Sequence, residues 1–224
     1  MEHLPIFLAL RGKKAAVVGG GLAAARRAEL LLRAGADVSL FAPALGSEFA
    51  ALREKFAFDH IGRWPDLQAD IGEASVCIVA TEDEARDRAA HGLARAAGAL
   101  VNVANAPDLC DFILPSIVDR SPVVVAISTG GASPILGRML KARLEAMIPA
   151  SYGRLADFIR ASRSRLNAVL SDASGRRRFW ERTLEGPIGE MALAGGEGRA
   201  PAALAAGIDS LAAGHDPAPR GEVY

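Results

Sequence analysis

A glycine-rich turn near the start of the chain carries the clearest chemical signal. Residues 17–24 read Val-Val-Gly-Gly-Gly-Leu-Ala-Ala and contain the G-x-G-x-x-A form of the dinucleotide fingerprint. In this pattern Gly19 permits a tight turn, Gly21 lets the backbone approach a pyrophosphate, and Ala24 lets the next helix pack closely. The helix N-terminus then offers unpaired N–H groups and the positive end of its dipole. The alternative interpretation is a purely structural glycine turn.

The end of the second predicted strand bears on the choice of dinucleotide. An acidic residue there usually receives the ribose hydroxyls of NAD. The strand ends instead in Phe-Ala-Pro-Ala at residues 41–44, with no acidic residue and no arginine that would favour a 2′-phosphate. We therefore expect NAD as the cofactor. The expected cofactor-binding residues are Gly19, Gly20, Gly21, Leu22, Ala23, Pro43, Ala44, Thr81 and Asn102.

Polar residues also follow two later strands. Thr81 comes directly after the apolar run 75–80, while Asn102 and Asn105 lie at the end of the run that begins at residue 100. Ligands of open α/β sheets bind beyond the carboxyl ends of the strands, so these side chains are expected to face the nucleotide crevice and could orient a substrate. In the alternative interpretation, the Asn, Pro and Asp residues simply form a turn.

Residues 128–134, Ser-Thr-Gly-Gly-Ala-Ser-Pro, combine a strand end, a glycine-rich turn and a helix start. Exposed backbone N–H groups there would form an anion site. The segment lacks the Gly-Lys-Ser/Thr ending of a P-loop, so carboxylates are the expected ligands rather than nucleotide phosphates. A plain helix cap is the alternative. The expected substrate-binding residues are Ser128, Thr129, Gly130, Gly131, Arg120, Arg138 and Lys141.

The overall charge argues against a polyanionic partner. The 224 residues include 26 basic and 26 acidic side chains, so no net field would draw the chain to nucleic acid or an anionic membrane. Between Arg120 and Arg182, however, 12 basic residues stand against four acidic ones. This local surplus suits an anionic ligand, although solvated helix faces would show the same pattern.

The cysteines, histidines and apolar runs indicate the protein class. Two cysteines, with Cys77 inside an apolar run, indicate isolated thiols rather than a disulfide framework. Four scattered histidines show no metal-ligand spacing, so no metal site is expected. No apolar stretch reaches about 20 residues, and the N-terminus lacks the features of a signal peptide. We expect a soluble cytoplasmic protein with no membrane or nucleic-acid partner.

The elements that position these residues alternate short β-branched runs with amphipathic helices, which is typical of parallel βαβ units. Strands are expected at 15–19, 37–41, 56–61, 75–80 and 100–104, with helices at 23–34 and 83–97. Two further strands at 112–118 and 123–128 precede helices at 134–148, 152–170 and 175–184. The part from Gly195 onward is expected to be a linker or a loosely packed helical tail. The fold class is therefore α/β: a Rossmann-like doubly wound parallel sheet, a small α+β region and a C-terminal helical region.

Several of these segments together indicate a family. They are residues 1–7, 18–21, 102–103, 112–120 (Phe-Ile-Leu-Pro-Ser-Ile-Val-Asp-Arg), 128–134 and 176–181. In order and spacing they resemble the N-terminal module of siroheme synthase, the precorrin-2 dehydrogenase and sirohydrochlorin ferrochelatase family. The resemblance covers nearly the whole chain.

The resemblance implies an NAD-dependent oxidation of precorrin-2 to sirohydrochlorin, often followed by iron insertion to give siroheme. It also implies a homodimer, with the tetrapyrrole between domains, and a polycarboxylate substrate suits the basic region after Arg120. The expected domains are an NAD-binding domain at 1–113, a dimerisation and substrate region at 114–148, a helical domain at 149–215, and a linker or the start of a methyltransferase domain at 216–224. Residues 220–224 resemble the first strand of the methyltransferase domain in fused siroheme synthases, so the chain is expected to be cut there.

One position departs from the family pattern. The loop after residues 102–103 usually carries an aspartate as the proposed acid/base and metal-handling residue, and here that position is Asn105. An amide cannot titrate, while Asp108 and Asp111 are close enough in sequence to substitute. The expected catalytic residues are Asn105 and Asp108. Thr129 stands where the family often has a phosphorylatable serine. A non-catalytic module that binds a nucleotide and a tetrapyrrole is the alternative function.

Overall fold

The computed structural model describes residues 2–194 and 199–213. The chain forms two compact units, Met1–Leu114 and Pro115–Tyr224, each of which is described by itself. The four-part division expected from the sequence is finer than these two units and stays a prediction. Within the described residues, no helix combines the length and apolar character that crossing a membrane would need.

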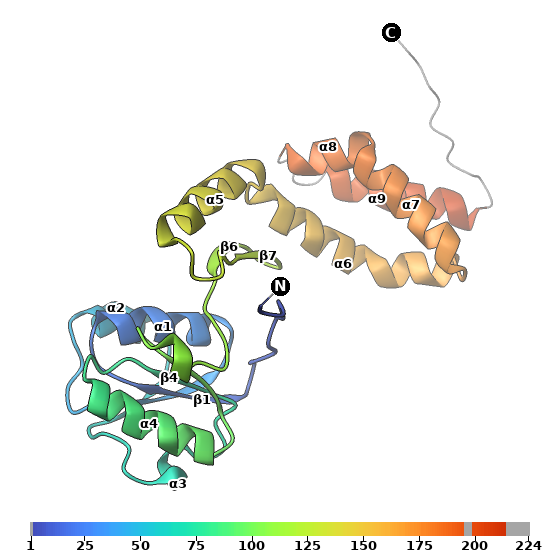
Figure 1. Ribbon diagram of the computed structural model, residues 1–224. Coiled ribbons are helices and arrows are strands. Elements are labelled where there is room, and N and C mark those ends of the chain that lie inside the picture. Colours follow the sequence, from blue (N-terminus) through green and yellow to red (C-terminus); the bar gives the residue numbers. More distant parts are fainter. Residues whose placement is uncertain (1, 195–198, 214–224) are drawn as a thin grey trace. The chain divides into compact units, whose positions relative to one another are not determined.

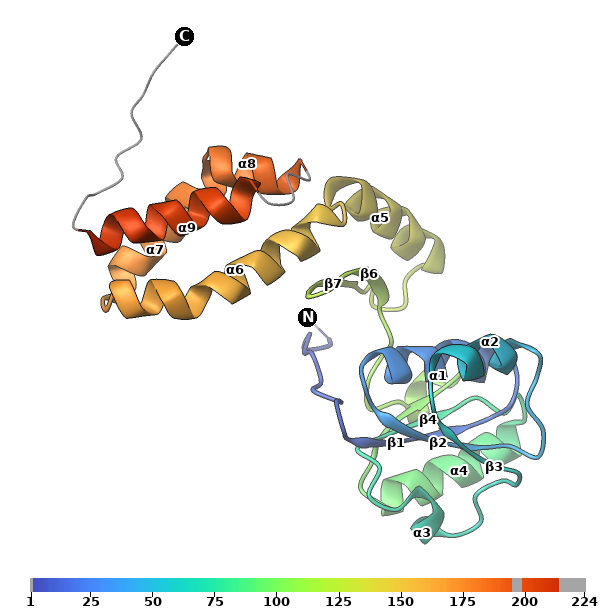
Figure 2. The same cartoon turned by 180° about the vertical axis from the view of Figure 1, so that it is seen from behind.

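The first unit is built on a five-stranded parallel sheet with the order β3-β2-β1-β4-β5 (Figures 1 and 2). Its strands β1 to β5 are Lys14–Val18, Asp37–Phe41, Asp59–Ile61, Val76–Val79 and Leu100–Val103. Its helices are α1 (Leu22–Arg33), α2 (Glu48–Lys55), α3 (Gln68–Ile71), α4 (Glu84–Ala96) and the 3₁₀ turn η1 (Pro107–Leu109). The expected doubly wound sheet is confirmed.

The sheet is covered on both faces, which is why its strands are nearly continuous apolar runs. All four residues of β4 are buried. Helices α1 and α2 pack on one face, and α3 and α4 pack on the other (Figure 1). Helix α1 presents Ala24, Ala25 and Ala28 to the sheet, and these small side chains allow the helix to lie close to β1.

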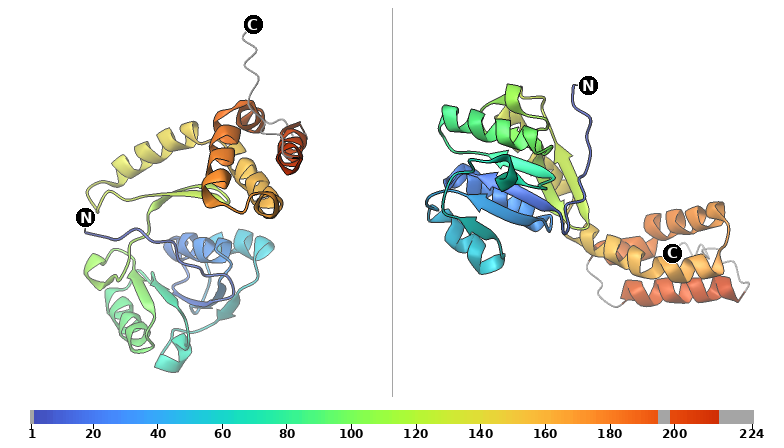
Figure 3. Two further views of the ribbon diagram at one scale, coloured as in Figure 1. Left: turned by 90° about the vertical axis from the view of Figure 1, so that its right-hand side faces the viewer. Right: turned by 90° about the horizontal axis from the view of Figure 1, so that it is seen from below.

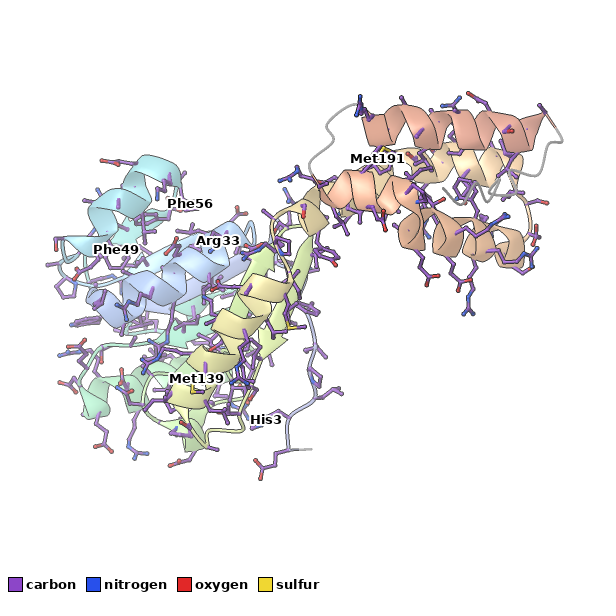
Figure 4. The ribbon with its side chains drawn as sticks, turned by 90° about the horizontal axis from the view of Figure 1, so that it is seen from above. His3, Arg33, Phe49, Phe56, Met139 and Met191 are labelled. Atoms are coloured by element: carbon purple, nitrogen blue, oxygen red, sulfur yellow. The ribbon has the colours of Figure 1, made fainter. Side chains whose placement is uncertain are left out.

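Helices α2 and α3 were missed by the sequence analysis. Helix α2 is short and mostly charged, and only Phe49 and Leu52 are buried, so it shows too little apolar periodicity to be recognised. Phe49 lies in the core, and Phe56, the residue after the helix, packs partly buried against the same core; both are labelled in Figure 4. The other helix boundaries agree with their capping signals, with Gly35 (φ 80°) just past α1 and Asp83 capping α4.

The second unit begins with a two-stranded antiparallel sheet, β6 (Ser116–Arg120) and β7 (Val123–Ile127). The expected start of the first strand at residue 112 is wrong, because residues 112–115 lie before the ladder and Phe112 and Leu114 pack on the core of the first unit. Helix α5 (Pro134–Met147) starts at Pro134 with Ser133 as its cap, as expected. Helix α5 leaves four large apolar side chains exposed, Ile135, Leu136, Met139 and Met147.

In the described part of the second unit, four helices follow α5 (Figure 3): α6 (Ser151–Val169), α7 (Ala173–Glu185), α8 (Pro187–Leu193) and α9 (Arg199–Ala212). Helix α9 is the helix expected after Gly195, but the expected loose packing is wrong, because its Ala200, Leu204 and Ile208 are buried. Leu204 and Ile208 share a core with Leu166 of α6 and Phe179 of α7. The expected strand at 220–224 lies outside the described residues.

Packing of α9 can be tested with Leu204→Ala. Leu204 has no exposed surface, so the substitution leaves a cavity and is expected to lower the free energy of unfolding of the second unit by about 2–5 kcal/mol. Leu184→Ala is the matched control, because Leu184 is 37% exposed and its truncation removes fewer contacts. Urea titration followed by circular dichroism measures both variants. An equal loss of unfolding free energy in the two variants would contradict the burial of Leu204 on α9.

Candidate functional site

The turn between β1 and α1 has room for backbone only. Gly19 has φ 140°, and a Cβ atom built there would lie 2.1 Å from the carbonyl oxygen of Ala80. A Cβ on Gly20 would lie 2.1 Å from the carbonyl oxygen of Ala44. Real Cβ atoms do not come so close, so both positions require glycine. The turn after β1 therefore touches the segments that follow β4 and β2.

The start of α1 is open to an anion. Gly21 is the N-cap and provides no side chain to bond the N–H groups of the first turn, which begins at Leu22. These donors and the helix dipole favour negative charge at this point. Ala24 is fully buried beneath the turn. A bare glycine cradle at an uncapped helix N-terminus fits the pyrophosphate of a dinucleotide, and the role of Gly19 to Ala23 in binding it stays a prediction.

The segment after β2 closes one side of this cradle. Gly46 N donates a hydrogen bond to Gly20 O at 2.8 Å, which holds the loop containing Pro43 and Ala44 against the glycine turn. His60 of β3 bonds the carbonyl of Ala42 through Nε2 at 2.9 Å. Pro43 and Ala44 thus lie beside the cradle, and their role in holding a cofactor stays a prediction.

The segment after β4 closes the other side. Thr81 N donates to Asp87 Oδ1 at 3.0 Å, and the Thr81 hydroxyl donates to the same oxygen at 2.6 Å. Asp87 is buried on α4, so the Thr81 side chain is turned toward that helix. Sequence reasoning missed Asp87. The sequence pattern that could have indicated it is a carboxylate in the first turn of a helix, where that helix follows a threonine at the end of a strand.

Asn102 and Asn105 have different surroundings. Asn102 lies within β5, is buried, and donates from Nδ2 to Phe112 O at 2.8 Å. Its amide nitrogen therefore anchors the chain where it leaves the sheet, and its cofactor role stays a prediction. Asn105 is exposed just past β5 with φ 63°. Asp108 is exposed on η1. Asn105 is thus placed at the carboxyl edge, where a ligand is expected.

Asp111 does not take the position of the missing carboxylate. Its Oδ2 accepts a hydrogen bond from Val101 N at 2.9 Å, its own N donates to Val101 O at 2.8 Å, and its side chain pairs with Arg95. Burial raises the pKa of Asp111, but the bonds from Val101 and Arg95 outweigh it and hold the pKa below its ordinary value. Val101 is near the start of β5, so Asp111 is bound away from the strand's carboxyl end.

The cysteines behave as the sequence indicated. Both are free thiols. Cys77 is buried in β4, and burial raises the pKa of its thiol to about 12. Cys110 Sγ accepts a hydrogen bond from Val103 N at 3.2 Å. Across the described ranges, no group of three or more His, Cys, Asp or Glu side chains could hold a metal ion.

The loop before α5 is organised by its own hydroxyl groups. Ser133 Oγ accepts from Leu136 N at 3.2 Å, which gives the helix an ordinary N-cap. Gly130 N donates to Ser128 Oγ at 3.1 Å, and Ser133 N donates to Thr129 Oγ1 at 3.3 Å. The interpretation of this segment as a helix cap is therefore confirmed. An additional role of this loop in substrate binding stays a prediction.

Arg120 forms hydrogen bonds within the fold. Its Nε donates to Ile148 O at 2.8 Å, and its terminal nitrogens donate to the carbonyls of Asp119 and Glu145. The carbonyls of Glu145 and Ile148 lie at the C-terminal end of α5, so the guanidinium caps that helix end. These bonds use three of the five N–H groups of the guanidinium, and the expected substrate-binding role of Arg120 stays a prediction. Arg138 is exposed on α5. Lys141 forms an ion pair with Glu145, with 3.9 Å between Nζ and Oε1.

The contacts of Asp111 predict a pH-dependent stability. Its folded-state pKa is lowered, so the carboxylate stabilises the fold fully above its unfolded value of about 3.9 and loses this effect as the pH falls through the folded value. Asp111→Asn is expected to lower the melting temperature at pH 7, and the difference from wild type should shrink below about pH 4.

Asp108→Asn is the control for that measurement, because the Asp108 side chain is exposed and bonds none of the described residues. Its melting temperature should follow the wild type at both pH values in differential scanning calorimetry. An Asp111→Asn variant as stable as the wild type at pH 7 would contradict the structural role.

Three family models match successive parts of the chain. Residues 6–116 match a model described as putative NAD(P)-binding. Residues 120–147 match the sirohaem biosynthesis protein central model, and residues 151–208 match the sirohaem synthase dimerisation region.

Curated relatives that match the whole chain are named siroheme synthase. The siroheme synthase of Nitrosococcus oceani is 45% identical over 229 residues, which cover 100% of this chain and 47% of that protein. The siroheme synthase of Thiobacillus denitrificans is 46% identical over 224 residues, covering 100% of this chain and 46% of its own length. The chain therefore spans about half the length of the curated relatives it matches.

A solved structure shares the fold. SirC, precorrin-2 dehydrogenase, is similar with a TM-score of 0.73 at 22% identity, covering 93% of this chain and 100% of that chain. The three models also follow one another along the chain in the order nucleotide-binding, central and dimerisation region. The chain thus belongs to the siroheme synthase family, of which it is the N-terminal module.

Proposed function

We propose that this chain catalyses the NAD-dependent dehydrogenation of precorrin-2 to sirohydrochlorin. The observation that carries the proposal is the backbone-only cradle at the N-terminus of α1, in a chain that belongs to the siroheme synthase family. Relatives named siroheme synthase and the similar fold of a precorrin-2 dehydrogenase support the substrate. The reaction removes a hydride and a proton from the tetrapyrrole.

NAD⁺ supplies the hydride acceptor when it is bound. The chain contributes the cradle, in which the first-turn N–H groups of α1 would hold the pyrophosphate and the loop of Pro43 and Ala44 would lie along the adenosine side. Gly19 and Gly20 keep this surface free of side chains. The protein's part in the reaction is thus mainly to bind and orient the two reactants.

The carboxylates of the tetrapyrrole would meet cations of the second unit. Arg138 is exposed on α5, and the basic surplus between residues 120 and 182 remains large without Arg120. The backbone of Gly130 and Gly131, at φ 61° and 82°, belongs to the same candidate site with Ser128 and Thr129. We place the family's homodimer on this unit, whose α5 exposes apolar side chains that a second copy would cover.

Proton transfer is where this chain departs from its family. Asn105 occupies the edge position expected of an acid/base residue, but its amide cannot carry the proton. Asp108 is the nearest exposed carboxylate along the chain and is assigned that task. Asn105 is also the specific observation in favour of a second candidate function, a non-catalytic module that binds a nucleotide and a tetrapyrrole.

A defined assay tests the dehydrogenase. Purified protein with precorrin-2 and NAD⁺ should give sirohydrochlorin, followed by its absorbance. Gly21→Ala is expected to raise the KM for NAD⁺ about tenfold or more, since a methyl group would stand where the pyrophosphate must approach. The variant should still fold, because Gly21 has φ −90° and its Cβ would meet only the flexible end of Glu82.

Gly92→Ala is the matched control for this assay. A Cβ at Gly92 on α4 meets nothing within 4 Å, so the variant should keep the wild-type KM and gain up to about 1 kcal/mol of helix stability. Absence of turnover by folded wild-type protein would leave the binding-module function.

Iron insertion is tested separately through Asn105. Asn105→Asp restores a carboxylate at a position where Asp tolerates φ 63°, and it is expected to increase the rate of iron insertion into sirohydrochlorin. Asn105→Gly suits the same backbone angle without adding a carboxylate, and should give no increase. Siroheme formation measured by absorbance compares the three proteins. Equal rates in all of them would remove the metal-handling role from this position.

A further inference from the structure

The residue that follows Thr81 is held in an unusual conformation. Glu82 has φ 64°, a left-handed angle that a side chain other than glycine rarely adopts. Its two neighbours explain this angle, because Thr81 is bonded to Asp87 and Asp83 caps α4 by accepting from Arg86 N at 2.9 Å. The chain must turn sharply between these fixed points. Glu82 and Asn105 are the two described non-glycine residues with positive φ.

This turn brings the Glu82 carboxylate to the glycine cradle. Its Oε1 lies 3.2 Å from the position that a Cβ on Gly21 would occupy. Glu82 is exposed, and none of the described residues forms a hydrogen bond or an ion pair with its side chain. A strained backbone thus places an unpaired carboxylate at the N-terminus of α1, where the structure otherwise favours an anion.

A carboxylate next to a pyrophosphate site must bind a donor rather than a phosphate, since two anions repel each other. An ionised carboxylate only accepts hydrogen bonds, and its two oxygens suit the two vicinal hydroxyls of a ribose. In dinucleotide-binding folds an acidic residue after β2 does this for the adenosine ribose. Here residues 41–44 provide no acid, so Glu82 is the carboxylate that the cradle offers.

The sheet order indicates which ribose Glu82 would meet. The adenosine half of a dinucleotide lies toward β2, and its pyrophosphate lies at the turn after β1. Strand β1 stands between β2 and β4 in the sheet. Glu82 follows β4 and is therefore on the opposite side of the pyrophosphate from the adenosine, which is the side of the nicotinamide ribose.

We propose that the Glu82 carboxylate accepts hydrogen bonds from the hydroxyls of the ribose on the nicotinamide side of NAD⁺. The inference rests on the proposed function for the identity of the dinucleotide. It gives Glu82 a positioning role, because a ribose fixed on both hydroxyls orients the ring attached to it.

Isothermal titration calorimetry with three ligands tests this assignment. NAD⁺ and ADP-ribose contain the second ribose, whereas ADP lacks it. Glu82→Gln is expected to lower the affinity for NAD⁺ and for ADP-ribose by about 10-fold to 100-fold, because hydrogen bonds to a charged group are lost. Its affinity for ADP should be unchanged or higher, because a negative charge near the phosphates has been removed.

Two further variants separate ligand binding from folding. Glu84→Gln changes a carboxylate two residues away that pairs with Arg88 at 2.9 Å, and it should bind all three ligands as the wild type does. Glu82→Gly removes the carboxylate and relieves the positive φ, so its melting temperature should not fall while its affinity for NAD⁺ and ADP-ribose does.

The outcomes distinguish the two levels of inference. If wild type and Glu82→Gln bind NAD⁺ with equal affinity, or if Glu82→Gln loses as much affinity for ADP as for NAD⁺, the role of Glu82 is overturned and the proposed function stands. A wild-type chain that binds none of the three ligands overturns the proposed cofactor, and the role of Glu82 with it. Selective loss for the two ligands with a second ribose supports the proposal.

Discussion

The first unit depends on a close approach of three backbone segments that only glycine permits. The carbonyls of Ala80 and Ala44 press against Gly19 and Gly20 at positions where any side chain would collide with them. This contact draws the segments after β2 and β4 against the turn after β1. The cradle, the start of α1 and the position of Glu82 all follow from it, because each lies on one of the segments so joined.

Several polar side chains near helix ends and strand ends are bonded within the fold. Arg120 caps the carboxyl end of α5, Ser133 caps its amino end, and Asp87 fixes the backbone of Thr81. Helix ends and strand ends expose unpaired backbone groups, and polar side chains nearby satisfy them first. The groups left for ligands are those that no side chain caps, such as the N–H groups at the start of α1.

The sequence predicted the parts of the fold whose signals are local. Buried strands such as β4, and helices with a clear cap such as α5, were placed within one or two residues. Helix α2 was missed because two buried side chains give no period, and α9 was judged loose because its Ala-rich face becomes a core only against α6 and α7. Packing between distant segments has no local signal.

The candidate site was predicted to a similar extent. The glycine turn was recognised because its residue types and spacing match a known dinucleotide-binding pattern, in which each glycine has a physical role. The orientation of side chains could not be read in the same way. Asp111 looked available because it is close to Asn105 in sequence, and its return to Val101 is visible only in three dimensions. Glu82 was overlooked because an exposed acidic residue at a helix start is ordinary, whereas its positive φ is not.

The return of the chain along β5 has a consequence for the protein's behaviour at high concentration. Strand β5 is an edge of the sheet, and its outward N–H groups at Val101 and Val103 would be open to a strand of another molecule. Asp111 and Cys110 already bond both of them. The opposite edge, β3, is only three residues long. Both edges are thus poor templates for intermolecular strand pairing, which protects an otherwise apolar parallel sheet from aggregation.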